Sequence, residues 1–273
     1  MKSFLTRLTS GVVLVLLIGW TCWRGSLPLG FFVTVIGGIG LDEFYKVFGM
    51  KITEGIGRAG FFGAVLWMAA VLVTTETGME AELKWLAILA AFMLLMAVYV
   101  FSFPKYDTGQ VVTAFFGIVY IPVMLSFIYL TRMLVVGFSL VWLIFFCSWG
   151  CDTFAYCTGM LLGRHKLAPV LSPKKSIEGA VGGVVGAAVL GAVYAAFTQA
   201  PVFIYALICA IGAAASQVGD LAASAVKRQH GIKDYGTLIP GHGGVLDRFD
   251  SVIVTAPMIY MLAVVLIGYQ QHR

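Results

Sequence analysis

The chain has 273 residues, of which 60% are hydrophobic and 11% are charged, whereas soluble proteins have about 45–50% apolar and about 25% charged residues. The 18 Lys plus Arg and 13 Asp plus Glu residues are too few to cover a soluble globule of this length. Soluble, disordered and nucleic-acid-binding proteins are therefore excluded, and the net charge of +5 is interpreted as a sign of membrane orientation.

About nine apolar runs are long enough to cross a membrane, since a hydrocarbon core about 30 Å thick needs roughly 20 helical residues. Lipid cannot satisfy backbone polar groups, and the alternating pattern of barrel strands is absent, so these runs favour helices. The sequence predicts an all-α, polytopic integral membrane protein with about nine transmembrane helices. In chain order, the runs cover residues 11–24, 27–45, 59–75, 85–103, 111–130, 134–162, 179–199, 202–226 and 250–268.

The first run follows Lys2 and Arg7 and has some features of a secretory signal, but it lacks a cleavage site of small residues. We therefore expect an uncleaved first span. Nine spans place the termini on opposite sides, and 14 of the 18 Lys and Arg residues then fall on the side of the N-terminus. By the positive-inside rule that side is cytoplasmic. Eight of these residues lie in two late loops, and without them the split is only six to four.

The distribution of charge changes along the chain. Before about residue 145, charged residues lie in short loops or at span ends, and beyond it they enter the spans and two long loops. We therefore interpret 1–144 as membrane scaffold helices and 145–273 as the catalytic part, within one integrated membrane domain. Asp42 and Glu43, at the end of the second run, are interpreted as interfacial residues that snorkel.

Two acids fall inside late apolar runs. Asp152 precedes the loop that starts at Gly163 by 11 residues, and Asp220 precedes Lys227 by 7, which places them ~16 Å and ~10 Å below the helix ends at 1.5 Å per residue. Ionisable side chains at membrane depth are costly and are functional candidates. A hydrated cavity is predicted, although either acid alone could be a structural polar residue bonded to a neighbouring helix.

The segment 224–250 has the densest concentration of charged residues and glycines. Asp247 and Asp250 are three residues apart at a helix start and can share one face. With Asp220 they offer the hard oxygen ligands that Mg²⁺ prefers. His242 stands among Gly241, Gly243 and Gly244, whose backbone can approach a phosphate closely. The positive charge that a polyphosphate needs is available from Lys227, Arg228, Lys233 and Arg248.

The second loop, 171–179, indicates a helix start with Ser176 or Ser172 as its cap. Lys174 and Lys175 stand at an end whose dipole attracts anions, although two lysines at a membrane edge are also ordinary topology determinants. Glu178, just inside the next run, favours a functional site. The small-residue spacing that follows predicts close helix packing and consists of Gly179, Gly182, Gly183, Gly186 and Gly191.

These motifs together resemble those of the phosphatidate cytidylyltransferases, or CDP-diacylglycerol synthases. The run S-x-x-K-R-x4-K-D-x-G-x3-P-G-H-G-G-x-x-D-R-x-D extends from Ser224 to Asp250. Gly219-Asp220, Ser172-Pro173-Lys174-Lys175-Ser176 with Glu178-Gly179, and Asp152-Thr153-x-Ala155-Tyr156 match in the same order. The resemblance covers roughly residues 145–260, and Ser176 stands where the family more often has Thr.

The resemblance implies a membrane enzyme that converts CTP and phosphatidic acid to CDP-diacylglycerol and diphosphate with Mg²⁺. It implies metal ligation by Asp220 and Asp247, with Asp250 a lesser candidate. Residues implied in catalysis or triphosphate binding are Lys227, Arg228, Lys233, Asp234, Arg248, Ser224, Gly241, His242, Gly243 and Gly244. Residues implied at the lipid phosphate are Ser172, Lys174 and Lys175, with Asp152 and Glu178 orienting bases or water.

The implied location is the inner (plasma) membrane, with the site facing the cytoplasm and membrane lipid beside it. The resemblance also suggests a homodimer. A transporter or channel would also bury acids in late spans, but it gives no reason for a Lys/Arg/Gly/His loop. A CTP-dependent enzyme acting on an ether lipid or a polyprenol would retain the same loop chemistry. The D-G-x2-A-R-x8-G-x3-D-x3-D pattern of CDP-alcohol phosphotransferases is missing.

Overall fold

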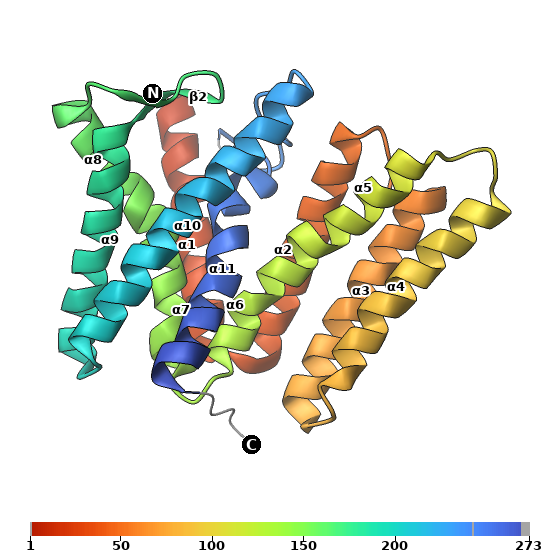
Figure 1. Cartoon of the computed structure of the whole chain (residues 1–273), viewed down its shortest axis with the longest axis horizontal. Coiled ribbons are helices and arrows are strands. Elements are labelled where there is room, and N and C mark those ends of the chain that lie inside the picture. The colour runs from red at the N-terminus through yellow and green to blue at the C-terminus, as the bar shows by residue number, and fades with distance from the viewer. Residues whose placement is uncertain (1, 242, 269–273) are drawn as a thin grey trace. The chain divides into compact units, whose positions relative to one another are not determined.

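A computed structural model describes residues 2–241 and 243–268, with residues 2–8 described as backbone alone (Figure 1). The described chain forms two compact units. Of the described residues, the first contains those up to Leu130 together with Asp234–Arg248, and the second contains Thr131–Lys233 and those from Phe249 to Gly268. The predicted boundary at residue 144/145 rests on where charged residues occur in the sequence, whereas the two units are defined by which residues pack together.

Helices begin and end close to the predicted apolar runs. The N-terminal half contains α1 (Lys2–Arg24), α2 (Ser26–Val47), α3 (Gly55–Thr77), α4 (Glu82–Phe101), α5 (Thr108–Ile118), the π-helical turn η1 (Val119–Val123) and α6 (Met124–Arg132). The C-terminal half contains α7 (Gly137–Phe145), the π-helical turn η2 (Phe146–Gly150), α8 (Cys151–Leu162), β1 (Lys166–Ala168), β2 (Ser172–Ser176), α9 (Ile177–Thr198), α10 (Val202–Gln229) and α11 (Leu246–Ile267).

Within the described residues, eight helical segments are long and apolar enough to span a membrane, counting 108–132 and 137–162 as continuous helices. The apolar part of α1, Thr9–Arg24, is shorter. The prediction of an all-α, polytopic membrane protein with about nine spans is confirmed in this form. The chain is thus a multi-pass membrane protein.

Three local features differ from the sequence-based expectation. The predicted loop 171–179 contains strand β2, which pairs antiparallel with β1. Helix α10 continues to Gln229, so Ser224 and Lys227 are helical and the connecting loop covers only residues 230–245. Two spans contain a π-helical turn, and the one in η1 includes Pro122, which lacks a backbone N–H for the helical ladder.

The first unit is built on large side chains of α2 that pack against α3 and α5. Phe44 and Tyr45 are fully buried, and the Tyr45 hydroxyl donates to the Ala114 carbonyl at 2.7 Å. A Cβ on Gly117 would lie 2.7 Å from the Tyr45 ring, so the helices approach closely at this point. The C-terminal turn of α2 is therefore held rigidly inside its unit.

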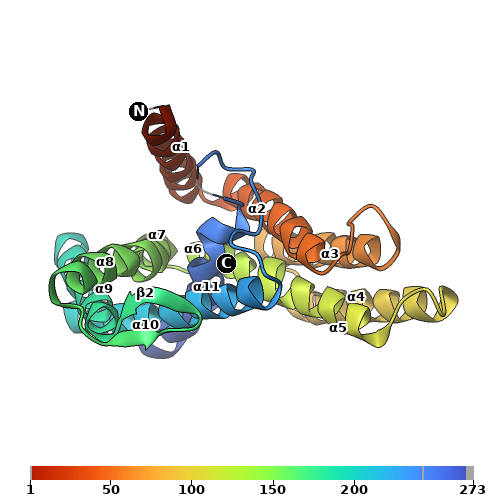
Figure 2. The same cartoon turned by 90° about the horizontal axis from the view of Figure 1, so that it is seen from above.

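The second unit packs α8, α9 and α10 around glycines, as predicted. A Cβ on Gly183 would lie 2.9 Å from the Cys151 carbonyl oxygen of α8, and one on Gly191 would lie 2.5 Å from Cys209 Sγ of α10. Only glycine permits these approaches, which confirms the small-residue packing. Figure 2 shows α8, α9 and α10 side by side.

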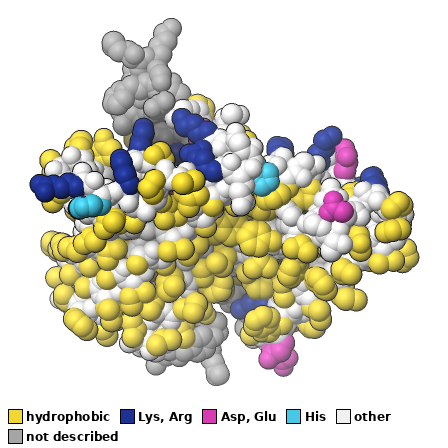
Figure 3. Space-filling model, turned by 45° about the horizontal axis from the view of Figure 1, so that its top comes forward, with side chains coloured by type: hydrophobic (Ala, Val, Ile, Leu, Met, Phe, Trp, Pro, Cys, Tyr) yellow, Lys and Arg dark blue, Asp and Glu magenta, His cyan; other side chains and the backbone are white. Residues whose placement is uncertain are grey.

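The opposite face of α9 is a stripe of exposed valines. Val181, Val185, Val189 and Val193 are each about half exposed and follow a four-residue spacing, which places them on one side of the helix. Figure 3 shows hydrophobic side chains covering most of the visible surface, with few charged side chains among them. This distribution is the one that lipid around the helices requires.

Candidate active site

The second unit contains a cavity of about 480 Å³ that five of its elements line, namely α8, β1, β2, α9 and α10. Polar side chains enter it from α8, β2 and α10, and the surrounding wall is apolar. The lining residues are Asp152, Ala155, Tyr156, Gly159, Met160, Leu167, Ser172, Lys174, Lys175, Ser176, Gly179, Ala180, Gln217 and Asp220. The two acids predicted within late spans therefore meet in one cavity, together with the predicted lipid-phosphate residues.

Local structure explains how α8 and α9 present their polar groups to this cavity. The π-helical turn η2 ends at Gly150, directly before the first turn of α8 that carries Asp152. Such a turn shifts the phase of a helix and is frequent at functional sites. At the start of α9, the Ser176 hydroxyl accepts a hydrogen bond from the Gly179 N–H at 3.1 Å, so the predicted cap is Ser176 rather than Ser172.

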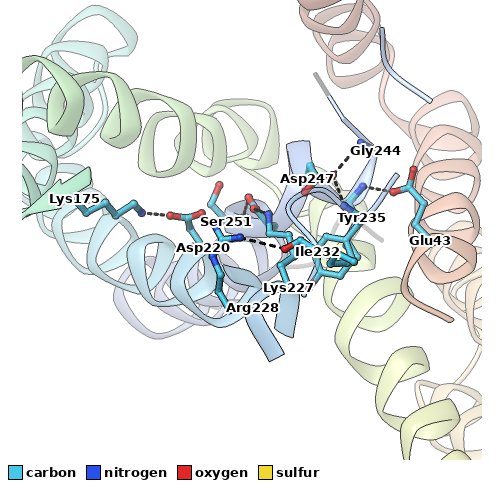
Figure 4. Close-up of polar contacts among 12 residues, drawn as sticks. Glu43, Lys175, Asp220, Lys227, Arg228, Ile232, Tyr235, Gly244, Asp247 and Ser251 are labelled. Atoms are coloured by element: carbon cyan, nitrogen blue, oxygen red, sulfur yellow. Dashed lines mark hydrogen bonds and ion pairs between the residues drawn. The ribbon is translucent and has the colours of Figure 1, made fainter. Parts of the chain in front are cut away.

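Lys175 and Asp220 form an ion pair across the cavity, from β2 to α10 (Figure 4). Their side chains are 28% and 22% exposed, so the pair is partly shielded from water. Gln217, one turn before Asp220, donates to the Ala180 carbonyl at 2.9 Å and fixes α10 against α9. Gln217 was not predicted as a site residue, although an amide within an apolar run is a signal of the same kind as the two acids.

Glu178 closes the β1–β2 segment onto α9. Its carboxylate accepts from the backbone N–H groups of Arg164 and His165, at 3.0 and 3.2 Å, and lies 2.6 Å from His165 Nδ1. Glu178 does not line the cavity, whereas Lys174 and Lys175 of the same segment do. In this structure it holds the residues that precede β1, the strand that pairs with the lysine-bearing β2.

The basic end of α10 is also tied within the second unit. Lys227 Nζ lies 3.8 Å from Asp250 Oδ2 of α11, and both residues are 8% exposed. Arg228 Nη1 donates to the Ile232 carbonyl at 3.2 Å, and thereby orders the turn that follows the helix. Ser224 is half-buried on α10 and Lys233 is exposed. Asp250, predicted as a lesser metal ligand, is therefore a partner of a predicted phosphate-binding lysine.

The glycine-rich loop and Asp247 belong to the first unit. Asp247 Oδ2 accepts from the backbone N–H groups of Tyr235 at 2.8 Å and Gly244 at 3.0 Å. Gly241 and Gly243 have φ of 77° and 85°, a conformation that favours glycine. The Gly244 N–H is taken up by Asp247, so this amide is not directed at solvent. Asp234 is exposed, Arg248 is half-buried, and His242 lies outside the described residues.

Glu43 corrects the interpretation of the end of α2. It is 5% exposed and accepts from the backbone N–H groups of Val245 at 3.0 Å and Leu246 at 2.8 Å (Figure 4). Snorkelling is therefore wrong for this residue, because its carboxylate points into the protein. It fits Asp42, which pairs with Lys46 at 2.5 Å on the helix surface. The sequence signal that could have identified Glu43 is an acidic residue within the last turn of an apolar run.

Within the described residues, no three His, Cys, Asp or Glu side chains form a metal-binding group. Asp220, Asp247 and Asp250 have protein partners in this structure, as given above. Their chemistry nonetheless fits Mg²⁺, which commonly binds one or two protein carboxylates together with substrate phosphate and water. Ligation by these acids stays a prediction.

Comparison with known proteins places these features in a family context. The profile of the cytidylyltransferase family matches residues 5–266. A protein from Brucella abortus named phosphatidate cytidylyltransferase is 34% identical over 270 residues, which cover 97% of this chain and 95% of that protein. Proteins of the same name from Bacillus subtilis and Staphylococcus haemolyticus are 31% and 28% identical, each over 94% of this chain and 96% and 98% of their own length.

Proposed function

The chain belongs to the cytidylyltransferase family and is a nucleotidyltransferase, and from this premise we propose that it converts CTP and phosphatidate to CDP-diacylglycerol and diphosphate. The observation that supports this most directly is the cavity that collects Asp152, Lys175 and Asp220 among apolar helices. A lipid phosphate needs cationic groups at membrane depth to bind it, and metal-assisted nucleotidyl transfer needs acidic side chains nearby to hold the metal ion.

The proposed reaction requires no nucleophile from the protein. A phosphate oxygen of phosphatidate forms a bond to the α-phosphorus of CTP, and the bond from that phosphorus to the departing diphosphate breaks. A phosphate monoester has a second pKa of roughly 6, so most of it is already dianionic at neutral pH. Catalysis then depends on holding the two anions in line and on neutralising their charge.

The residues of the cavity fit the lipid phosphate. Lys174 and Lys175 bring two positive charges to its wall, and the Ser172 hydroxyl can donate a hydrogen bond. Lys175 already pairs with Asp220, so the site has a cation that is positioned before substrate arrives. Asp152 is proposed to orient water or a substrate group.

The triphosphate is proposed to bind to cationic side chains at the end of α10 and in the loop that follows it. The backbone of that loop is proposed to contribute as well. These groups are Lys227, Arg228, Lys233, Arg248, Gly241 and Gly243, with His242 between the two glycines. Asp220 and Asp247 are each proposed as ligands of Mg²⁺, which would supply neutralisation of charge on the phosphate oxygens. Since the Gly244 N–H donates to Asp247, we assign Gly244 to the shape of the loop.

CTP is a cytosolic metabolite of high charge, whereas phosphatidate keeps its acyl chains in the bilayer. We therefore propose that the site opens to the cytoplasm at the headgroup level of the inner membrane. This orientation agrees with the excess of Lys and Arg predicted on the cytoplasmic side. A homodimer remains a prediction from the resemblance.

The test uses the purified full chain in detergent micelles with radiolabelled CTP, Mg²⁺ and one lipid phosphate at a time. We expect label in the organic phase with phosphatidate, one diphosphate released per label incorporated, loss of transfer with EDTA and recovery with added Mg²⁺. Transfer to a polyprenyl phosphate but not to phosphatidate would refute the lipid assignment. Absence of transfer to every lipid phosphate would refute the reaction.

A further inference from the structure

Glu43 is a buried acid that the proposed reaction does not use. A buried carboxylate is costly unless hydrogen bonds satisfy it, and the partners of Glu43 are two consecutive backbone amides. Oε1 accepts from Val245 and Oε2 accepts from Leu246, at 3.0 and 2.8 Å. These amides lie about 200 residues away in the sequence, at the start of α11.

The start of α11 explains why an acid is needed there. The first N–H groups of a helix have no partner within it, and a side chain at the preceding position usually provides the acceptor. In α11 that position is Val245, whose side chain cannot accept a hydrogen bond. Glu43 provides the acceptor from α2, and its negative charge lies at the positive end of the α11 dipole.

The same helix start also carries Asp247, which accepts from Gly244 and Tyr235. The three consecutive amides of residues 244–246 are thus divided between two carboxylates, one from α2 and one from α11 itself. The position of the Asp247 carboxylate depends on this shared stretch of backbone. Leu246, whose N–H donates to Glu43, directly precedes Asp247. A change at Glu43 should therefore shift the backbone that positions the Asp247 carboxylate.

The loop is shaped to fit the Glu43 carboxylate. A Cβ on Gly236 would lie 2.4 Å from Glu43 Oε1, and one on Gly244 would lie 2.5 Å from both of its oxygens. Two of the glycines in the motif therefore make room for this acid. Further along, the Ser10 hydroxyl of α1 donates to the Pro240 carbonyl at 3.2 Å, so the loop is attached to its unit at a second point.

We propose that Glu43 is a positioning residue: it holds the end of the loop and the first residue of α11, residues 243–246, against α2 and thereby fixes the carboxylate of Asp247 for the reaction. It touches neither CTP nor the lipid phosphate in this role. The effect on turnover rests on the proposed function, whereas the attachment of the loop does not. The two parts of the proposal can therefore be tested separately.

The first measurement is hydrogen–deuterium exchange of the full chain, comparing Glu43→Gln with wild type. Gln keeps the size of the side chain but offers one acceptor oxygen to two N–H groups. We expect exchange within residues 243–248 to accelerate roughly 10- to 100-fold, as expected for a lost charged hydrogen bond, while α3 and α9 keep wild-type protection. The matched control is Asp42→Asn, which removes the neighbouring surface acid and should leave the loop unchanged.

The second measurement is CTP transfer to phosphatidate as a function of Mg²⁺. We expect Glu43→Gln to lower kcat about 10- to 100-fold and to raise the Mg²⁺ concentration for half-maximal activity, with a smaller change in the KM for phosphatidate. Asp42→Asn should match wild type. Unchanged loop exchange in Glu43→Gln would overturn the proposal whatever the activity. Accelerated exchange with unchanged kcat and Mg²⁺ dependence would overturn the positioning role. If wild type transfers no CTP, the proposed function fails and exchange alone decides the loop attachment.

Discussion

Asp220→Asn offers a direct test of the cavity, because the substitution removes one negative charge and little else. Asp220 pairs with Lys175, and the two side chains are 22% and 28% exposed. Asn has nearly the same size and can still accept a hydrogen bond from the lysine. The fold of the second unit should therefore tolerate this change.

The expected effects on stability and activity differ in size. Partly exposed ion pairs contribute about 1 kcal/mol or less, so the free energy of unfolding should fall by no more than that. A group that stabilises charge in the transition state is worth about 10²- to 10³-fold in kcat, or about 3–4 kcal/mol. Asp220→Asn should therefore be folded and nearly inactive.

The assay pairs radiolabelled CTP transfer with thermal melting of the same preparation. A matched control is Glu54→Gln, which breaks the exposed pair between Lys51 and Glu54 at 3.4 Å and should leave both measurements unchanged. Wild-type turnover in Asp220→Asn would refute the role of this acid. A melting temperature as low as that of a globally destabilised variant would show that the acid is structural.

Three further predictions concern the packing and caps that support the site. Gly183→Ala would place a Cβ 2.9 Å from the Cys151 carbonyl and should cost about 1–3 kcal/mol, whereas Gly19→Ala, with no atom within 4 Å, should not lower the melting temperature. Ser176→Ala should cost about 1 kcal/mol by removing the α9 cap, and Ser176→Thr should retain most of it; equal melting temperatures for both would contradict the cap. Lys227→Met leaves the buried Asp250 charge without this cation and should cost about 3 kcal/mol, partly recovered when Asp250→Asn is added; thermal melting decides this too.

Much of the fold could be predicted because membrane helices are specified locally. Apolar runs such as 27–45 and 179–199 agree within a few residues with α2 and α9, since lipid cannot satisfy backbone polar groups and each run must therefore form its own helix. The Ser176 cap and the glycine face of α9 were also predictable, because each depends on neighbours within a few residues along one helix.

The cavity was predictable only in part. Asp152 and Asp220 stand out because ionisable residues in apolar runs are rare, but their meeting with Lys175 depends on how α8, β2 and α10 pack. The short strand β2 and the π-helical turn before Asp152 left no clear signal in the sequence. Both depend on contacts with other elements rather than on local preference.

The role of Glu43 was decided by tertiary structure alone. Sequence placed it correctly at the end of an apolar span, where an exposed and a buried acid have the same local pattern. Its partners are backbone amides of Val245 and Leu246, and a backbone N–H has no residue identity that a sequence could reveal. Composition and periodicity thus determined which segments cross the membrane, whereas the pairing of a carboxylate with amides two hundred residues away was determined only when the chain folded.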